Sequence, residues 1–436
     1  MTLDSLEPVV SLAKRRGFIF PGSDIYGGLA NSWDYGPLGA QMRMNIKTDW
    51  WKKIVEQRAD MVGLDGAIMM NPKVWEASGH VDTFNDPLVE CKKCNKRFRA
   101  DTMTGEEKCL KGKDHELSEP RTFNLMFQTS LGKTGEDKGM VYLRPETAQA
   151  MFVNFKHVLD TTRKRLPFGI AQIGKAFRNE ITPGNFTFRT LEFEQMEIEY
   201  FLEEEDWKES FESWANWMEE WAASVGINPD MLHRLEVPEE ELAHYSKRTL
   251  DFEFDFPFGT KELWGLAYRT DFDLKNHEKH SGESLVYSDP ADNKRKVVPH
   301  VVEPTFGVDR TLLAMLVSAY SEEEVKDGDT RVVMQFKPHM APYHIAVLPL
   351  SKKEELSGVT HEIFEDLIKT YRCEYDDTGS IGKRYRRQDE IGTPYCVTVD
   401  FDSLEDKAVT VRDRDTMEQE RISIEELKNY FENKFN

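Results

Sequence analysis

The sequence predicts an α+β fold, in which an antiparallel sheet is flanked by helices and is followed by a smaller C-terminal α/β domain. Two long helical stretches, residues 40–62 and 206–226, each carry a single apolar stripe. Strand-like stretches such as 250–259 are joined by turns and loops, which favours antiparallel pairing over a doubly wound sheet. From about His339 strands and helices alternate, as they do in a small α/β domain.

Length and charge set the general class of the protein. The chain has 436 residues, 39% hydrophobic and 31% charged, so we expect two or three globular domains. No apolar run approaches the roughly 20 residues of a membrane span, and the first residues lack the order of a secretory signal. We therefore expect a cytoplasmic protein without a membrane partner. The formal net charge of −21 means that a nucleic-acid partner would need a local basic patch.

The first helix is expected to bury one stripe, because its apolar residues are four positions apart. These residues are Met42, Ile46, Trp50 and Ile54. A strand is expected directly after it, over Gly66–Pro72. The second helix carries an aromatic stripe that is far more typical of a core than of a cofactor site. This stripe consists of Trp207, Phe211, Trp214, Met218 and Trp221.

A hairpin is predicted with arms over 170–180 and 188–200, joined by a loop with a Pro-Gly pair. Because side chains alternate along a strand, one face would combine arginine, an aromatic ring and carboxylates. Such a face could clamp a phosphate, stack a flat ring on Phe193 and accept hydrogen bonds from amines. Alternation alone leaves open a hairpin at a sheet edge with cross-strand salt bridges. The residues in question are Arg178 and Glu180 on one arm, and Arg189, Leu191, Phe193, Gln195, Glu197 and Glu199 on the other.

The C-terminal part is predicted to begin after a proline-containing linker, so that residues 1–338 form one domain and residues 339–436 form another. Strands are expected over 344–350, 394–401 and 407–413, and helices over 351–371 and 423–435. This domain also contains a basic cluster, for which a solvated helix face is the alternative to a binding surface. The cluster consists of Lys383, Arg384, Arg386 and Arg387.

Three segments resemble the signature motifs of the class II aminoacyl-tRNA synthetases. The sequence FRNE, a loop, and then Arg189, Phe193 and Glu197 at steps of four resemble motif 2. Phe306–Arg310, at the start of an apolar helix, resembles motif 3. The first helix and the strand ending at Pro72 resemble motif 1, which builds the dimer interface in that class. The resemblance implies a class II synthetase-like fold and a homodimer through motif 1.

The finer resemblance is to glycyl-tRNA synthetases of the homodimeric type. It extends from about Phe18 to the C-terminus and rests on WDYGPLG, WEASGHVDTFNDPLVEC, LRPETAQ, FRTLEFEQMEIE, ELWGLAYRTDFDL and VVEPTFGVDR. The last 98 or so residues resemble the anticodon-binding domain of the glycyl, histidyl, prolyl and threonyl enzymes. The resemblance implies that the protein activates glycine with ATP and Mg²⁺ and transfers the glycyl group to tRNA(Gly). Two departures are Thr305, where many members have serine, and Ala150, where glycine is usual.

The resemblance also implies roles for individual residues. Arg178 and Arg310 would be catalytic, Arg178 at the α-phosphate and Arg310 with Arg189 at the γ end of a bent ATP. The ATP contacts would be Arg178, Asn179, Glu180, Phe188, Arg189, Phe193, Glu262, Leu263, Gly307 and Arg310. The glycine contacts would be Arg99, Glu146, Phe193, Glu194, Gln195, Glu197, Glu303, Thr305 and Gly307. Glu262 and Glu303 are candidate Mg²⁺ ligands, and an exposed acidic residue without metal is the alternative for Glu262.

An insertion at about 85–140 contains half of a tetrahedral zinc site, the pair Cys91 and Cys94. Cys109 and His115 would complete it, and free thiols are the alternative. The total of five cysteines argues against a disulfide framework. In the second domain, the resemblance makes the basic cluster a candidate for tRNA phosphate contacts.

Two rival functions remain open at this stage. One is a non-catalytic relative that binds nucleic acid, although the three motif arginines are all present. The other is a class II enzyme for another amino acid. A glycine enzyme needs no editing domain, because a tight pocket rejects every larger amino acid sterically.

Overall fold

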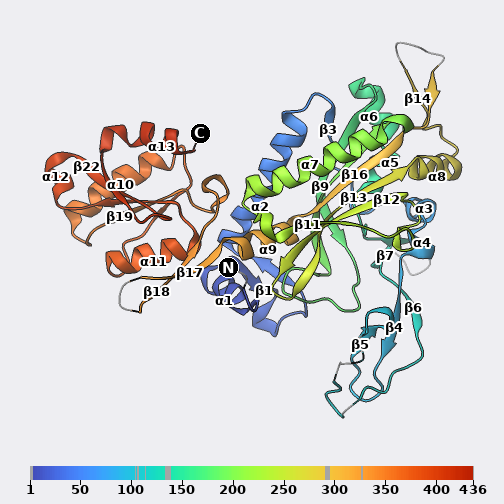
Figure 1. Cartoon of the computed structure of the whole chain (residues 1–436), viewed down its shortest axis with the longest axis horizontal. Coiled ribbons are helices and arrows are strands. Elements are labelled where there is room, and N and C mark those ends of the chain that lie inside the picture. The colour runs from blue at the N-terminus through green and yellow to red at the C-terminus, as the bar shows by residue number, and fades with distance from the viewer. Residues whose placement is uncertain are drawn as a thin grey trace.

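Two bodies make up the molecule, and they correspond to the predicted α+β part and the smaller α/β part (Figure 1). The structure is a computed structural model that describes residues 3–103, 105, 108–112, 114–132, 139–289, 295–325 and 328–435. Among these residues, the larger body is built on a seven-stranded sheet and the C-terminal body on a five-stranded sheet. No helix in the described ranges is both long and apolar enough to cross a membrane.

The large sheet is antiparallel apart from one edge strand, β3, which pairs parallel to β9. The predicted preference for antiparallel pairing is therefore confirmed. The order of strands within the described chain is β11 (Leu232–Glu236), β12 (Arg248–Phe256), β13 (Gly259–Thr270), β16 (His300–Gly307), β10 (Glu192–Leu202), β9 (Phe168–Phe177) and β3 (Met61–Gly63).

Three helices cover one face of this sheet: α2 (Pro37–Trp51), α7 (Trp207–Val225) and α9 (Val308–Ala319). All four residues of the predicted α2 stripe are 0% exposed, and the aromatic stripe of α7 lies mostly in the same apolar core. Both helices are confirmed, but the first ends earlier than predicted: α2 stops at Trp51, a π-helical turn over Lys52–Glu56 carries Ile54, and Met61 already belongs to β3. From β10, alternate residues Met196, Ile198 and Tyr200 point into this core, so Gln195, Glu197 and Glu199 face the opposite side.

The opposite face is only partly covered. At one end α5 (Ala148–Val153), α6 (Phe155–Thr162) and α8 (Phe272–Ser281) pack on the strands through a second apolar cluster. That cluster includes Ile170 of β9 and Phe201 of β10. The rest of the face carries polar residues and borders the cavity described below. The sheet thus has the main apolar core on one face, and on the other a second apolar cluster at one end and a polar surface beyond it.

The strand predicted over Gly66–Pro72 is wrong. Only Met69 of this stretch makes an isolated bridge, with Leu143, and the neighbouring strand β3 ends at Gly63. The reason lies in the sequence, because Asn71 caps the helix α3 (Pro72–Ala77) by accepting a hydrogen bond from the Lys73 main chain. Proline at the first position of a helix fits this arrangement. Ile68 and Met69 are left 36% and 52% exposed.

The predicted hairpin is formed by β9 and β10, with Glu192 opposite Phe177. At the loop, β9 ends at Phe177 and β10 begins at Glu192, so both strands are shorter there than predicted. Arg178, Glu180 and Arg189 therefore lie on the connecting segment rather than on the strands. Arg189 still pairs with Gly184 through its main chain, which narrows the loop.

The insertion projects away from the sheet (Figure 1). Its described part contains β4 (Asn85–Glu90), β5 (Arg97–Arg99) and β6 (Arg121–Asn124), followed by the pair β7 (Gln128–Leu131) and β8 (Gly139–Tyr142). The remaining elements of this body include α1 (Glu7–Arg16), β1 (Ile19–Pro21), β2 (Trp33–Tyr35), α4 (His80–Thr83), β14 (Tyr287–Ser288) and β15 (Lys296–Val297).

The C-terminal body has its own apolar core and the predicted alternation of strands and helices. Its described strands are β20 (Cys373–Tyr375), β19 (Ile345–Pro349), β21 (Tyr395–Val399), β22 (Ala408–Asp413) and β23 (Gln419–Ser423), in that order. Its helices are α10 (Glu354–Leu367), α11 (Ile381–Ile391), α12 (Asp402–Asp406) and α13 (Leu427–Phe435).

A hairpin, β17 (Tyr320–Glu324) and β18 (Thr330–Met334), connects the two bodies and packs against α11. The buried Arg331 of β18 donates from Nε to Asp389 of α11, at 2.9 Å. Asp389 also accepts from Arg412 of β22, again at 2.9 Å. A buried ion pair thus holds the hairpin to the C-terminal body, and its carboxylate is shared with a second arginine of that body.

Candidate active site

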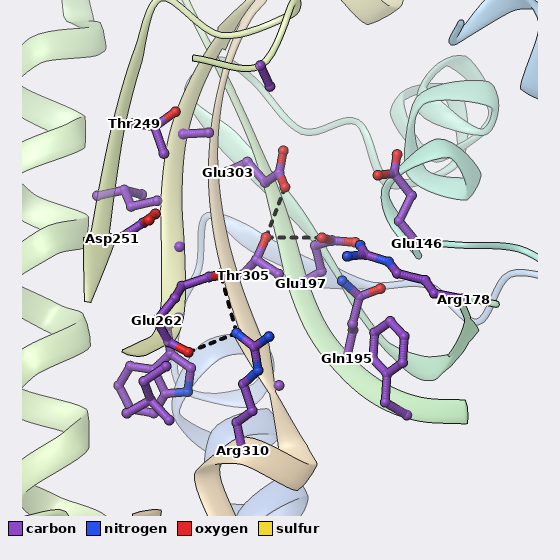
Figure 2. A pocket seen from close by; sticks show the side chains of 18 of the residues that line it. Glu146, Arg178, Gln195, Glu197, Thr249, Asp251, Glu262, Glu303, Thr305 and Arg310 are labelled. Atoms are coloured by element: carbon purple, nitrogen blue, oxygen red, sulfur yellow. Dashed lines mark hydrogen bonds and ion pairs between the residues drawn. The ribbon is translucent and has the colours of Figure 1, made fainter. Parts of the chain in front are cut away.

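A cavity of about 370 Å³ lies on the polar face of the large sheet. Residues of β10, β12, β13 and β16 line it, together with the loop of the β9–β10 hairpin and the start of α9. The three motif arginines, Arg178, Arg189 and Arg310, all belong to this lining. The charges of Arg310, Arg178 and Arg189 all lower the pKa of the Glu262 carboxyl. Figure 2 shows Arg310 beside Glu262 in one part of the cavity, and Thr305 between Glu197 and Glu303 in another part. We call these parts the arginine end and the acidic end.

At the arginine end, Arg310 is fixed by main-chain oxygens. Its Nη1 donates to the Glu262 carbonyl at 2.8 Å and lies 3.2 Å from the Glu262 carboxylate (Figure 2). The guanidinium also lies 4.4 Å from the centre of the Phe188 ring. Desolvation in the cleft opposes ionisation of Glu262, but the Arg310 charge outweighs it and keeps the pKa of that carboxyl below its ordinary value.

Arg178 is held in a similar way. Its Nε donates to the Pro145 carbonyl at 3.1 Å, which leaves the two terminal nitrogens for other partners. Its guanidinium lies 5.3 Å from the ring centres of both Phe84 and Phe193. Two aromatic rings and a carbonyl thus fix the plane of the guanidinium at the wall of the cavity.

The segment of α9 that carries Arg310 is anchored by its neighbour Asp309. The Asp309 carboxylate accepts a hydrogen bond from the Glu194 main chain at 2.8 Å and another from the Tyr35 hydroxyl. Arg43 of α2 lies 3.0 Å from the same carboxylate. These contacts tie the start of α9 to the middle of β10 and to α2.

The acidic end holds three buried carboxyl groups and one hydroxyl. Thr305 Oγ1 lies 3.0 Å from Glu197 and 2.9 Å from Glu303, so it bridges the two side chains (Figure 2). Glu303 also accepts from Arg269, and Glu146 accepts from Gln149 at 3.0 Å. Every one of these carboxyl groups therefore has a fixed position before any ligand is present.

The bridge through Thr305 implies a proton on one of the carboxyl groups. A hydroxyl carries a single proton, so it can donate to only one of the two, and the other contact requires a protonated carboxyl. Burial, together with the charges of Glu303 and Glu146, raises the pKa of Glu197 to about 8. Burial also raises the pKa of Glu303. The acidic end is therefore partly protonated at neutral pH when it is empty.

Glu199 lies one step deeper along β10. It is 0% exposed, and its two oxygens have no hydrogen-bond partner among the described residues. Burial raises its pKa well above the ordinary value, and the Glu303 charge adds to this effect. Glu199 is thus a neutral acid beneath the acidic end and does not line the cavity.

Glu262 and Glu303, the two candidate Mg²⁺ ligands, lie too far apart to hold the same ion. Glu303 pairs with Ala267, which is five residues beyond Glu262 on β13. At a rise of about 3.3 Å per residue this separates the two positions by about 16 Å. Glu303 is instead paired with Arg269, whereas Glu262 faces the arginine end.

Most of the predicted contact residues line the cavity, and three do not. Glu194 points to the opposite face of β10, where it accepts from Arg43 at 2.7 Å and from Lys47 at 3.1 Å. Its predicted glycine contact is therefore wrong, because strand alternation turns it away. Arg99 pairs with Asp86 and Asp101 on the insertion, and Asn179 is not in the lining either. The predicted residues within the lining are Glu146, Arg178, Glu180, Phe188, Arg189, Phe193, Gln195, Glu197, Glu262, Leu263, Glu303, Thr305, Gly307 and Arg310.

Sequence reasoning missed several lining residues. Thr249 and Asp251 come from β12, whose period-two pattern places them on the polar face opposite Leu250 and Phe252. That signal was present in the sequence. Tyr245, on the loop before β12, lines the cavity as well, and no local pattern predicts it.

Ala150, where glycine is usual, is accommodated by a glycine elsewhere. A Cβ atom on Gly66 would lie 2.5 Å from the Cβ of Ala150. The close approach of the two chain segments is therefore preserved, because Gly66 supplies the space that Ala150 takes.

In the insertion, the four predicted zinc ligands lie together. The ligand atoms of Cys91, Cys94, Cys109 and His115 are all within 4.8 Å of one another. The Cys91 and Cys109 sulfurs are 3.8 Å apart, and Cys94 Sγ lies 3.7 Å from His115 Nδ1. Such separations and such ligands fit a four-coordinate tetrahedral ion.

The basic cluster lies on α11, as expected, but it is not a uniform surface. Arg384 is 1% exposed and donates to the carbonyls of Pro349, Asp377 and Gly379. Its predicted tRNA contact is wrong, because the side chain joins α11 to the sheet. The other three members, Lys383, Arg386 and Arg387, line a groove together with Arg16 of α1. Within it, Arg386 pairs with Asp329 and Arg387 with Asp376.

Comparisons with known proteins agree with this geometry. Residues 133–319 match the model of the tRNA synthetase class II core domain (G, H, P, S and T), and residues 344–434 match the anticodon binding domain. The chain is 56% identical to a glycine–tRNA ligase of Acetivibrio thermocellus, covering 99% of this chain and 98% of that protein. It is 54% identical to the glycine–tRNA ligase of Bacillus anthracis, covering 99% of each.

Among solved structures, the chain resembles a prolyl-tRNA synthetase from Cryptosporidium parvum complexed with halofuginone and AMPPNP. The TM-score is 0.67 at 15% sequence identity, and the match covers 98% of this chain and 74% of that chain. At this identity the likeness concerns the fold alone.

Proposed function

Because this chain belongs to the glycine–tRNA ligase family of class II tRNA synthetases and charges tRNA with glycine, we propose that the cavity described above is where glycine and ATP react. The observation that carries the proposal is the composition of its two ends. Three arginines line the cavity and their charges all act on the Glu262 carboxyl, whereas buried carboxyl groups form the acidic end. A triphosphate and an ammonium group are the chemical complements of these two ends.

The first step is an attack of the glycine carboxylate on the α-phosphorus of ATP, with pyrophosphate as the leaving group. No protein nucleophile is needed, since binding both substrates in line supplies most of the acceleration. Charge gathers on the phosphate oxygens in the transition state, and fixed cations stabilise it there. In the second step, a terminal ribose hydroxyl of the tRNA takes the glycyl group from the adenylate, and AMP leaves.

Arg178 would hold the α-phosphate, and Arg189 with Arg310 would hold the γ end. The main-chain partners of Arg178 and Arg310 support this assignment, because carbonyls orient a guanidinium without neutralising its charge. Phe193 would stack on the adenine, and Glu180 would accept from its exocyclic amine.

The acidic end would bind the glycine ammonium through Glu146, Glu197 and Glu303. Its bridging hydroxyl on Thr305 keeps two of these groups in place. A charged ammonium entering a partly protonated cluster would displace the proton that the cluster carries, because the positive charge favours the ionised carboxyl groups.

Glu262 fits Mg²⁺ by the chemistry of its hard carboxylate oxygens at the arginine end. The ion would supply positive charge at the ATP phosphates, while Glu262 keeps Arg310 in place through its carbonyl. The insertion would hold a structural Zn²⁺ on Cys91, Cys94, Cys109 and His115. Metal analysis of the purified protein tests this, since about one zinc per chain is expected and the variant Cys94→Ser should lose it.

We also propose a homodimer through the surface of α2 and the segment after it. Met44, Ile68 and Met69 support this proposal, because these apolar side chains are 54%, 36% and 52% exposed. Sedimentation at micromolar concentration should give twice the chain mass, and Met69→Asp should shift it toward the monomer. The tRNA would be contacted by Lys383, Arg386 and Arg387, with the C-terminal domain beginning near residue 339. Since ribosomes consume its product, we place the activity in the cytoplasm.

Amino-acid-dependent exchange of pyrophosphate into ATP tests the proposed reaction. Glycine should support exchange, whereas alanine, serine and proline should not. Absence of exchange with all four would favour a binding protein without catalysis, and exchange only with another amino acid would end the glycine assignment.

A further inference from the structure

We propose that Tyr245 is the steric wall that restricts the acidic end of the cavity to glycine. This inference rests on the proposed function and extends it, because it assigns the selection against larger amino acids to one side chain. Tyr245 lies on the loop that joins β11 to β12, outside the three signature motifs.

The position of the ring is the first argument. Tyr245 lines the cavity together with Glu146 and Glu303, which belong to the acidic end. Its ring covers the guanidinium of Arg269, at 3.8 Å from the ring centre, and Arg269 in turn pairs with Glu303. The aromatic surface therefore stands beside the carboxyl groups that would bind the ammonium.

The Tyr245 ring cannot move away from the cavity, because the Arg269 side chain against which it packs is held rigidly. Arg269 is 1% exposed and donates from Nε and Nη2 to the two oxygens of Asp273, at 2.8 and 2.9 Å. The centre of the Phe152 ring, which is 0% exposed, lies 5.3 Å from the same guanidinium. Tyr245 is thus linked through Arg269 to a residue of an apolar cluster, where close packing leaves little space for displacement.

The loop itself is fastened to the sheet. The main chain of Val237 donates to Thr249 at 3.0 Å, and that of Lys247 donates to Tyr268 at 2.9 Å. Between them, the His244 ring packs against Phe272 at 5.2 Å. A loop tied at both ends and in the middle holds its tyrosine in one place.

The other groups at this end are poorly suited to the same task. Glu146, Glu197, Glu303 and Thr305 have polar atoms that are bonded to one another or to neighbours and would be needed for the ammonium. Among the lining residues at the acidic end, Tyr245 has the bulkiest side chain. Burial raises the pKa of Tyr245 above its ordinary range, so the ring stays neutral within the acidic cluster.

The test compares glycine- and alanine-dependent pyrophosphate exchange in Tyr245→Ala. We expect the ratio of kcat/KM for glycine to that for alanine to fall by about 10- to 100-fold, as for the opening of a space of a few methylene groups. Most of the change should come from a gain with alanine. Tyr245→Phe keeps the ring and should keep the ratio. Glu240→Ala, an exposed change on the same loop outside the cavity, should alter neither amino acid.

An unchanged ratio in Tyr245→Ala overturns the inference, whatever happens to the rate with glycine. Loss of exchange with both amino acids in a variant that still folds and binds ATP also overturns it, since Tyr245 would then only support the loop. If the alanine variant does not fold, Tyr245→Val takes its place with the same criterion. Failure of the proposed function would be recognised separately, because the unmodified protein would then show no exchange with glycine.

Discussion

The two ends of the cavity are built on opposite principles. At the acidic end the side chains are buried and bonded to one another, as in the bridge from Glu197 through Thr305 to Glu303. At the arginine end Arg178 and Arg310 are held by main-chain carbonyls and keep part of their surface open. The acidic end thus has a fixed shape, and the arginine end has oriented charge. On the proposed assignment, the first would suit a small substrate and the second a large one that enters and leaves.

The largest effect is expected at the arginine end. Arg310→Ala removes the cation that is proposed to bind the γ-phosphate of ATP. Glycine-dependent pyrophosphate exchange should fall by about 1000-fold or more, because a preorganised charge that stabilises a transition state has an effect of about this size. Binding of tRNA, measured by filter retention, should stay nearly intact. Equal loss of both would show that Arg310 supports the fold, and Arg234→Ala, on the outer strand β11, is the matched control.

A smaller effect is expected for Arg178→Lys at the same end, and it distinguishes the role of the positive charge from that of the guanidinium geometry. Arg178→Lys keeps a positive charge but loses the planar fork, so we expect a decrease of about 10- to 100-fold in kcat/KM for ATP. Arg178→Ala should cost more. If lysine restores the full rate, the end acts as a diffuse positive potential rather than through oriented hydrogen bonds.

Glycine binding at the acidic end should depend on pH, whereas ATP binding at the arginine end should not. Since the pKa of Glu197 is raised to about 8, the empty site carries a proton at neutral pH. Glycine binding should therefore weaken as pH falls below about 8, by up to about tenfold per unit for one proton released. The KM for glycine should follow this course while the KM for ATP changes little. A glycine KM that is flat between pH 6 and about 9 would contradict the raised pKa.

Stability without glycine should depend on pH in the opposite direction. In the unfolded chain a glutamate loses its proton near its ordinary value, whereas Glu197 in the folded chain keeps it up to about pH 8. The folded state thus binds more protons between these limits, and this group makes the free energy of unfolding fall as pH rises through the window. Thermal unfolding of Glu197→Gln should lose this contribution.

The smallest effect is expected for Thr305→Ser, which keeps the bridging hydroxyl and removes a methyl group. The glycine kcat/KM should change by no more than about threefold, because the loss of one methyl group creates little space. Thr305→Val keeps the shape and removes the hydroxyl, and it should cost about tenfold or more, since two carboxyl groups lose their common partner. A larger effect of Thr305→Ser than of Thr305→Val would mean that the methyl group, rather than the hydroxyl, matters at this position.

The parts of this molecule that periodicity controls were predictable. The stripes of α2 and α7 are buried because apolar residues recur at steps of three and four. In the sheet, alternation could have excluded Glu194 from the cavity. Glu194 lies two and four residues before the core residues Met196 and Ile198, so its side chain points to the same face as theirs. Alternation thus excludes Glu194 from the cavity, but it does not separate Glu197, which lines the cavity, from the buried Glu199.

A run of basic residues does not show which of them are exposed, whereas their helical spacing does. Arg384 lies on one helical stripe with Gln388 and Ile391, which are also buried, so its position on α11 could have been read from steps of three and four. Tyr245 had no such signal, because it lies on the irregular loop between β11 and β12, where no periodicity indicates which way a side chain points. The same holds for Gly66 and Ala150, whose contact joins separate segments.

The buried ion pair between the hairpin and the C-terminal body also bears on motion between the two bodies. Swinging the C-terminal body away from the hairpin would separate Asp389 from Arg331 and leave buried charges without a partner, at a cost of about 3–5 kcal/mol. The C-terminal body is therefore expected to keep its orientation, so that a long partner reaching both bodies would meet a fixed spacing between them.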